Sequence, residues 1–384
     1  NCKQSCKIKA SRSCERLIMV QLELKNICKG FDHPVIDNLS LELEKGEFFV
    51  IVGPSGIGKT TLLRCIAGLE KLDQGEIHIE GENITNLPPY KRDVAMTFES
   101  YALYPHMTVF QNIANPLVAM KKDESFIKER VTEISKLLKI SNLLERKPHE
   151  ISGGQKQRTA LGRTLASEPK VFLLDEPISH LDAKIRAELR SQFHNLEALR
   201  EVSTVYVTHD YAEALSLGDR IGVMGNGGLM QIGSAHEIYE KPNSLFVAQH
   251  LGQPGINSFE AELSSEGDSY FAVAGEFKLP IAEEHWKILN GKKISKCHLG
   301  IRPQYIQLGL SSEKSETETT VFQGNVDVFE ALGSYGVMMV SILGESFTLL
   351  TDPEDRYQHN DNVSLKFDPK TFHYFDINSG QNLI

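Results

Sequence analysis

The stretch Gly53-Pro54-Ser55-Gly56-Ile57-Gly58-Lys59-Thr60-Thr61 decides the fold, and it directly follows the apolar run Phe48 to Val52. It matches the pattern G-x-x-x-x-G-K-[ST] in full and precedes a helical stretch, Leu62 to Gly68. Glycines let successive backbone N–H groups converge on a phosphate at a helix N-terminus, where the helix dipole also favours an anion. We therefore predict a phosphate-binding loop, in which Lys59 reaches the β- and γ-phosphates of a nucleotide and the Thr60 hydroxyl ligates Mg²⁺.

The surrounding sequence, from residue 20 to about residue 245, alternates short β-rich runs with amphipathic helical stretches. Such alternation is typical of an α/β domain, in which helices cover a largely parallel sheet. The stretch Glu124 to Ile140 carries apolar residues at helical spacing and predicts a helix. Candidates for buried strands are Phe48 to Val52, Lys170 to Leu174, Thr204 to Val207 and Arg220 to Met224.

A second chemical motif is the apolar strand Val171 to Leu174, which ends in Asp175 and Glu176. Because side chains alternate along a strand, these two carboxylates point in different directions. We assign Asp175 to the Mg²⁺ shell and Glu176 to general-base catalysis or water positioning. An apolar strand followed by acidic residues is common, but together with the loop at Gly53 it indicates nucleotide hydrolysis.

A third motif, Ser152-Gly153-Gly154-Gln155, precedes the helical stretch Lys156 to Ala166. One nucleotide needs one phosphate cradle, so a second Ser/Gly-rich helix start suggests a symmetric dimer that encloses two ATP molecules. A plain helix N-cap explains the same residues, and the sequence leaves both interpretations open.

Composition narrows the class of protein. The chain has 384 residues and a mass of 43.0 kDa, which indicates two or three domains. With 41% hydrophobic and 24% charged residues it has ordinary globular composition. Lys and Arg number 41 against 51 Asp and Glu, so the net charge is −10 and we expect no nucleic-acid partner. No apolar run reaches the roughly eighteen residues that a membrane-spanning helix needs.

The six cysteines form no C-x-x-C pair and have no His at zinc-finger spacing. Reduced thiols in a cytosolic protein are therefore favoured over disulfides or a metal site. Residues 1–18 contain three of these cysteines and much basic charge but no apolar core of a signal peptide. We treat them as an extension outside the fold, since a clear alternating strand begins after Met19.

Beyond about residue 250 helical periodicity fades, and short alternating segments appear between Gly, Ser, Asp and Pro turns. We predict a second, all-β domain of small-barrel type, with its boundary near Gly252 to Gly255. The expected strands are Phe259 to Leu263, Val321 to Phe329, Val337 to Leu343, Phe347 to Leu350 and Val363 to Phe367.

Taken together, these motifs resemble the nucleotide-binding subunit of an ATP-binding-cassette (ABC) transporter over nearly everything from residue 20 onward. The resemblance implies an α/β P-loop NTPase cassette with a helical subdomain, followed by an all-β oligonucleotide-binding-like barrel. It implies ATP hydrolysis with ATP and Mg²⁺ as cofactors. The expected division is an extension at 1–18, an ABC ATPase domain at 19–250 with the helical subdomain at about 100–165, and an all-β regulatory domain at 251–384.

The resemblance also implies further site residues. Ser152 to Gln155 correspond to the signature motif, with Ile151 where Leu is usual, and they close on the γ-phosphate of the partner's nucleotide. His209, in Val207-Thr208-His209-Asp210, is expected at the γ-phosphate, although a lone His after a strand is more often structural. Asp182 stands in the loop that links the two sites of the dimer, and Phe31 stands where the family has an aromatic residue that stacks on adenine.

One residue departs from the family pattern. Glu99, in Val94-Ala-Met-Thr-Phe-Glu99-Ser100, replaces the glutamine that contacts Mg²⁺ and the lytic water and couples to the permease. A carboxylate can still ligate Mg²⁺, but it adds negative charge near the triphosphate and removes an amide donor. We therefore expect a slowed but real ATPase.

More narrowly, Tyr101-Ala-Leu-Tyr-Pro-His-Met-Thr-Val109, Leu181-Asp-Ala-Lys184 and Gly300-Ile-Arg-Pro303 resemble the ATPases of bacterial carbohydrate importers, such as the maltose and glycerol-phosphate systems. This implies a dimer of two copies of the chain on two transmembrane permease subunits, with a substrate-binding protein beyond them. The region Tyr101 to Met120 is expected to dock the permease, and the protein to lie peripherally on the cytoplasmic face of the membrane. A regulatory protein is a possible partner of the C-terminal domain.

Three alternatives stay open at this point. Importers of polyamines, inorganic ions or osmolytes share the same plan. A weakly hydrolysing regulatory ABC protein is compatible with Glu99. A soluble ABC protein acting on DNA or ribosomes is disfavoured, because there is a single cassette, an acidic charge balance and no sustained heptad pattern between Thr60 and Ser152.

Overall fold

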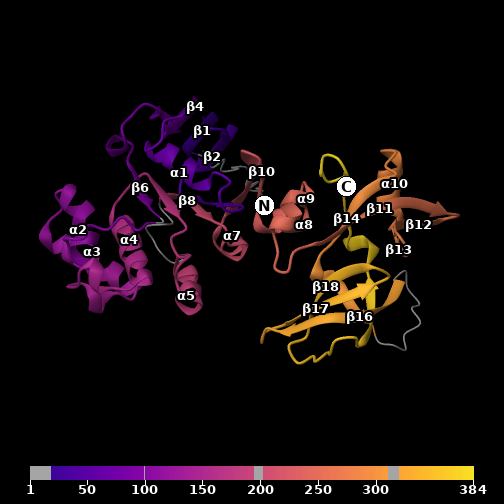
Figure 1. The fold of residues 1–384 in the computed structure, drawn as a ribbon. Coiled ribbons are helices and arrows are strands. Elements are labelled where there is room, and N and C mark those ends of the chain that lie inside the picture. The colour runs from indigo at the N-terminus through magenta and orange to yellow at the C-terminus, as the bar shows by residue number, and fades with distance from the viewer. Residues whose placement is uncertain (1–18, 99, 194–201, 310–319) are drawn as a thin grey trace, which may run out of the picture. The chain divides into compact units, whose positions relative to one another are not determined.

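The computed structural model describes residues 19–98, 100–193, 202–309 and 320–384 (Figure 1). The chain divides into two compact units, which we call the first unit (residues 1–48 and 61–205) and the second unit (residues 49–60 and 206–384). The predicted extension at 1–18 and the predicted metal ligand Glu99 lie outside the described residues. The division of the chain near residue 250 stays a prediction.

The first unit begins with an antiparallel sheet whose strands run in the order β2-β1-β4-β5. Alternation along β1 buries Leu22 and Leu24. Gly75 is needed where β4 meets β1, since its φ is +91° and a Cβ atom there would lie 2.5 Å from the carbonyl oxygen of Lys25. The strands are β1 (Val20–Gly30), β2 (Pro34–Glu44), β4 (Gln74–Ile79) and β5 (Glu82–Asn83).

The helices of the first unit include a packed group of three, α2, α3 and α4 (Figure 1). Gly162 of α4 allows this packing, because a Cβ there would lie 3.1 Å from Leu138 and 3.3 Å from Ile113. The predicted helix at 124–140 is confirmed as α3. The helices are α1 (Lys59–Ala67), whose first two residues belong to the second unit, α2 (Val109–Ala119), α3 (Glu124–Leu137), α4 (Gly153–Ala166) and α5 (Ala183–Phe193), with 3-10 turns at Pro89–Lys91, Ser141–Leu143 and Pro148–Glu150.

Parallel strand pairs occur in both units. In the first unit β6 (Val94–Thr97) pairs in parallel with β7 (Val171–Asp175). In the second unit β3 (Phe48–Val52) pairs in parallel with β9 (Arg220–Gly225), and β9 pairs antiparallel with β10 (Gly228–Gly233). Every residue of β3, β7 and β8 (Ser203–Thr208) is buried, which confirms the prediction of buried strands.

The second unit continues with three short helices and two five-stranded antiparallel sheets, ordered β13-β12-β11-β14-β20 and β15-β19-β16-β17-β18. All five strands expected in this region are present. The elements are α7 (Tyr211–Leu217), α8 (Ala235–Glu240), α9 (Leu245–His250), β11 (Asn257–Glu266), β12 (Ser269–Ala274), β13 (Phe277–Pro280), β14 (Lys296–Ile301), β15 (Ile306–Gly309), β16 (Thr320–Ala331), β17 (Gly336–Ile342), β18 (Glu345–Thr351), β19 (Asn362–Phe367) and β20 (His373–Phe375).

One helix, α10 (Glu283–Gly291), interrupts this β-rich region, and the sequence pattern did not predict it. Its nine residues are too few for a clear helical period. It packs through the fully buried Leu289 and through Trp286, whose ring stacks on Tyr270 with centroids 4.8 Å apart. This helix is therefore stabilised by its packing contacts, which a short sequence pattern does not reveal.

The two five-stranded sheets share a core centred on Phe277 of β13. Its ring centroid lies 6.1 Å from that of Phe259 in its own sheet. Three rings of the other sheet, Phe322, Phe347 and Phe367, have centroids 4.5, 5.2 and 5.9 Å from it. Aromatic side chains bury large apolar areas, so this cluster holds the sheets face to face.

Among the described residues, no helix is long and apolar enough to cross a membrane. The three cysteines in the described part of the chain, Cys28, Cys65 and Cys297, are free thiols, as the sequence predicted.

We expect the stability of the β-rich region to fall in mild acid because of His373 in β20. Burial, together with the positive charge of Arg302, lowers the pKa of His373 from 6.5 to about 4. The unfolded chain therefore binds this proton below pH 6.5, and the folded chain does not until about pH 4. The contribution of His373 to the free energy of unfolding should be nearly constant above about pH 7 and fall by about 2 kcal/mol between pH 7 and pH 5.

The measurement is urea unfolding followed by fluorescence of Trp286, the single tryptophan, which reports on this region. The variant His373→Asn should lose most of the difference between pH 7 and pH 5. An equal pH dependence in the variant and the parent would contradict the assignment to His373.

Candidate functional site

The predicted phosphate loop lies in the second unit, between the end of β3 and the start of α1. Gly56 and Gly58 have φ values of +79° and +111°, which only glycine adopts without strain. Gly53 approaches β9 closely, since a Cβ atom there would lie 2.5 Å from the carbonyl oxygen of Met224. Glycine is therefore required at these positions by the backbone itself.

Lys59 begins α1 with its side chain directed back into the loop. The residue is 5% exposed, and its ammonium donates hydrogen bonds to the carbonyl oxygens of Gly53 (2.8 Å) and Pro54 (2.9 Å). A buried cation thus sits at the N-terminus of a nine-residue helix, where free backbone N–H groups and the helix dipole already favour an anion. Thr60 and Thr61 follow in the first turn. This arrangement fits a polyphosphate.

The two predicted catalytic carboxylates lie in the first unit, where β7 ends. Asp175 is 3% exposed, and its N–H donates to the hydroxyl of Thr97 at the end of β6 (2.9 Å). The strand that leads to position 99 therefore runs beside the strand that ends in Asp175.

Glu176 adopts a left-handed backbone conformation with φ +43°, which is costly for a non-glycine residue. Its carbonyl oxygen accepts hydrogen bonds from the side-chain amide of Gln157 (3.0 Å) and from the N–H (3.3 Å) and hydroxyl (3.0 Å) of Ser179. The sequence motifs did not predict these roles of Gln157 and Ser179. For Gln157 the available signal was a polar residue on the buried face of α4, where it is 4% exposed.

The Ser/Gly-rich segment caps α4. Ser152 accepts a hydrogen bond from the N–H of Gln155 (3.4 Å), and the Gln155 side chain accepts one from the N–H of Ser152 (2.9 Å). This reciprocal pair is a capping box. Gly153 and Gly154 form the first turn. The plain N-cap interpretation is thus fulfilled, and a contact of these residues with a second copy's nucleotide stays a prediction.

Asp182 also has a local role, because its carboxylate accepts the N–H of Ile185 (3.0 Å) in the first turn of α5. Arg186 holds the same segment by donating to the carbonyl oxygens of Ser179 (2.9 Å) and Leu181 (3.0 Å). The ring of His180 meets that of Tyr101 edge to face, with centroids 6.2 Å apart. The segment 179–182 therefore contacts the residues that follow position 99.

His209 is exposed and follows β8 in the second unit. Its loop is fixed by Glu213, which is 2% exposed and whose carboxylate accepts the hydroxyls of Tyr206 (2.8 Å) and Thr208 (2.9 Å). Asp210 caps α7 by accepting the N–H groups of Ala212 and Glu213. The role of Glu213 was not predicted from the sequence, although an Asp followed three residues later by a Glu is the signal of a helix start.

The predicted site residues thus form two sets. In the second unit the phosphate loop and His209 follow β3 and β8, which are neighbours in their sheet. In the first unit Asp175 is hydrogen-bonded to Thr97 of β6, and the carbonyl oxygen of Glu176 is hydrogen-bonded to Gln157 of α4. Phe31 lies apart from these contacts, at the turn after β1, and is 61% exposed.

The donor chemistry fits a magnesium nucleotide. The Thr60 hydroxyl and the Asp175 carboxylate are hard oxygen ligands of the kind that Mg²⁺ prefers. The described residues contain no cluster of three or more His, Cys, Asp and Glu side chains that could hold a metal alone. That is expected for Mg²⁺, which takes one or two protein ligands and completes its shell with phosphate and water.

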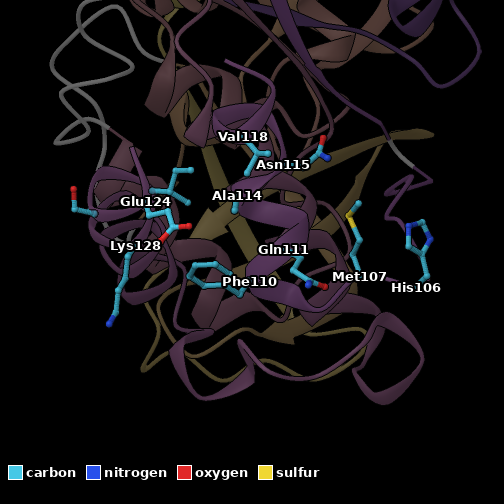
Figure 2. Close-up of a pocket in the computed structure, with 11 residues that line it drawn as sticks. His106, Met107, Phe110, Gln111, Ala114, Asn115, Val118, Glu124 and Lys128 are labelled. Atoms are coloured by element: carbon cyan, nitrogen blue, oxygen red, sulfur yellow. The ribbon is translucent and has the colours of Figure 1, made fainter. Parts of the chain in front are cut away.

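A groove in the first unit lies between α2 and α3 and has a volume of about 810 Å³ (Figure 2). Met107, Phe110, Ala114 and Val118 give it an apolar lining, and Glu124 and Lys128 of α3 add one charge of each sign. These four apolar residues fall in the region 101–120, where we expected a docking surface, whereas Glu124 and Lys128 lie beyond it. Val118 is 59% exposed, so an apolar side chain of the groove is accessible to a partner.

Comparison with known proteins places these features in one family. Residues 36–179 match the ABC transporter family, and residues 299–375 match the TOBE domain family. The trehalose/maltose import ATP-binding protein MalK of Thermococcus litoralis is 40% identical over 94% of this chain and 99% of that protein. The spermidine/putrescine import ATP-binding protein PotA of Thermotoga maritima is 43% identical over 80% of this chain and 83% of that protein.

A solved structure agrees with the fold. It is the dimeric post-hydrolysis state of the ATP-binding cassette MJ0796 bound to ADP and Pi, with a TM-score of 0.51 and 29% identity. It covers 56% of this chain and 98% of that cassette. The predicted α/β P-loop cassette followed by an all-β domain is confirmed. The chain belongs to the ABC transporter family and is an ATPase of that family.

Proposed function

We propose that this ATPase is the energy-coupling subunit of an importer for a sugar or a glycerol-phosphate. The observation that carries the proposal is the match to MalK along 99% of that importer subunit, which continues through the C-terminal region. The match to the polyamine subunit PotA, although slightly higher in identity, covers 83% of that protein. An importer of the polyamine class is therefore the second candidate.

In the proposed reaction, the backbone N–H groups of the loop 53–58 and the Lys59 ammonium bind the phosphates of ATP. The Thr60 hydroxyl and the Asp175 carboxylate hold Mg²⁺, which when bound neutralises charge on the phosphates. Glu176 accepts a proton from the attacking water, and His209 donates to the γ-phosphate oxygens. Phe31 stacks on the adenine. By the family resemblance, Glu99 supplies a further carboxylate to the metal in place of the usual glutamine and slows hydrolysis.

The proposed active form is a dimer of two copies. Ser152 to Gln155 of one copy would then complete the site of the other, with Asp182 in the connecting loop. Two observations support this form. MJ0796 was solved as a dimer, and here the N-terminus of α4 begins with a Ser/Gly-rich turn, and helix N-termini favour anions.

The permease is proposed to dock on the groove between α2 and α3 (Figure 2). The apolar lining favours binding of an amphipathic helix. In the proposed dimer, the groove of each copy would bind one such helix, from a cytoplasmic loop of one of the two permease subunits. The protein would then lie peripherally on the cytoplasmic face of the membrane and act on an extracytoplasmic substrate-binding protein through the permease. The C-terminal domain would remain available to a regulatory protein.

The catalytic assignment predicts that Glu176→Gln lowers kcat for Mg²⁺-dependent ATP hydrolysis by at least about hundredfold, because the general base is lost. ATP binding should persist. The variant Glu99→Gln should instead raise kcat, since it removes a negative charge near the triphosphate. Steady-state phosphate release by the purified protein measures both. Turnover that survives Glu176→Gln, or that does not rise in Glu99→Gln, would contradict the respective assignment.

The docking assignment predicts that Val118→Asp weakens binding of the protein to its permease in detergent-solubilised membranes by at least about tenfold, because a charge enters an apolar contact. Hydrolysis by the isolated protein should be unchanged. The matched control is Val321→Asp in β16, whose parent side chain is also exposed, at 37%. Equal permease binding by both variants would count against the groove.

The cargo is tested with the whole importer, purified from its own membrane through a tagged copy of this chain together with its substrate-binding protein. Maltose, trehalose or sn-glycerol-3-phosphate should stimulate ATP hydrolysis, because cargo-loaded binding protein favours the hydrolysing state. Stimulation by spermidine alone would replace the carbohydrate proposal with the polyamine one.

A further inference from the structure

The ring of Phe31 has two faces in different environments. The residue is 61% exposed at the turn after β1. The Lys29 ammonium lies over one face, 4.9 Å from the ring centroid. A cation over an aromatic face is attracted by the ring's electrons and excludes a second flat group from that face. Only the opposite face is therefore left for a base.

The lysine is held in this position by Asp73, which stands between α1 and β4. One carboxylate oxygen of Asp73 lies 3.6 Å from the Lys29 ammonium. The Lys29 side chain is only 11% exposed, so water offers its ammonium few alternative partners. Asp73 itself is about half exposed.

Asp73 also fixes the backbone that presents the ring. Its second carboxylate oxygen accepts the N–H of Gly30 (2.7 Å), the residue directly before Phe31. Its own N–H donates to the carbonyl oxygen of Cys28 (2.9 Å). Three contacts from one residue thus set both the backbone at the end of β1 and the cation behind the ring.

We propose that Asp73 is a positioning residue for the nucleotide base, acting through Lys29 and Gly30 to hold Phe31 with one face open. The inference rests on the proposed stacking of adenine on Phe31. A ring held in its bound orientation loses little freedom when a base stacks on it, so Asp73 raises affinity without touching the nucleotide. It should affect the binding of the base and leave phosphate binding and the chemical step unchanged.

The experiment measures binding by calorimetry in the Glu176→Gln background, with MgATP and with inorganic tripolyphosphate, which has no base. Asp73→Ala removes the charge and the Gly30 contact and should raise the Kd for MgATP about tenfold. Asp73→Asn keeps an acceptor for Gly30 and should raise it about threefold. Neither variant should change the Kd for tripolyphosphate. In the parent background KM should rise while kcat is unchanged.

A double variant separates this inference from the stacking proposal. Phe31→Ala should raise the Kd for MgATP, and adding Asp73→Ala should raise it no further. The matched control is Glu23→Gln, which removes another ion pair of β1, with Lys25 at 3.0 Å, and should leave both Kd values unchanged.

Three results would contradict either the positioning role of Asp73 or the stacking on Phe31. An unchanged Kd for MgATP in both Asp73 variants, or an additive effect in the double variant, would overturn the positioning role while Phe31 keeps its own. Weaker tripolyphosphate binding in both Asp73 variants would mean general structural damage and would also overturn it. No effect of Phe31→Ala alone would remove the stacking proposal on which the inference rests.

Discussion

The buried ammonium of Lys59, hydrogen-bonded to the carbonyl oxygens of Gly53 and Pro54, is the interaction on which the site depends. The backbone can curve around a side chain in this way only if Gly56 and Gly58 adopt positive φ values. The loop must also start from a strand that β9 approaches closely at Gly53. The pairing of β3 with β9 therefore fixes where the loop starts, and α1 fixes where it ends. Both elements serve the same requirement, that the loop backbone enclose the Lys59 ammonium.

In the rest of the site, side chains of one element repeatedly fix the backbone of another element by hydrogen bonds. Helix α4 supplies two such side chains. Gln157 holds the strained carbonyl of Glu176, and Arg163 donates to the carbonyl oxygens of Ala102 (2.7 Å) and Tyr101 (3.3 Å). Tyr101 and Ala102 both have positive φ values, +64° and +43°, so their turn needs external support. One helix, capped by Ser152, thus supports both Glu176, the proposed general base, and the turn that leads to the groove.

The sequence predicted the elements and the chemistry better than it predicted the contacts between them. Phe48 to Val52 was recognised because a fully buried strand followed by glycines is a strong local pattern. Gln157 and Glu176, by contrast, are 19 residues apart, and Lys29 and Asp73 are 44 apart, so no local pattern links them. Helix α10 was missed for the related reason that Tyr270, from β12, supplies its main packing partner. Contacts between distant residues are decided by the fold, which a single sequence does not display.

Arg302 belongs to the segment Gly300 to Pro303, which the family resemblance singled out, and the structure gives this residue a physical role. It is fully buried after β14 and donates hydrogen bonds to the carbonyl oxygens of Ala248, Leu251 and Tyr239. Its guanidinium also lies over the Tyr239 ring, 4.1 Å from the centroid. Burial lowers the pKa of Arg302 but leaves it charged, so the carbonyl groups at the ends of α8 and α9 must compensate the charge. Lysine cannot replace it, since a point charge would not reach three carbonyl groups and stack on a ring at once.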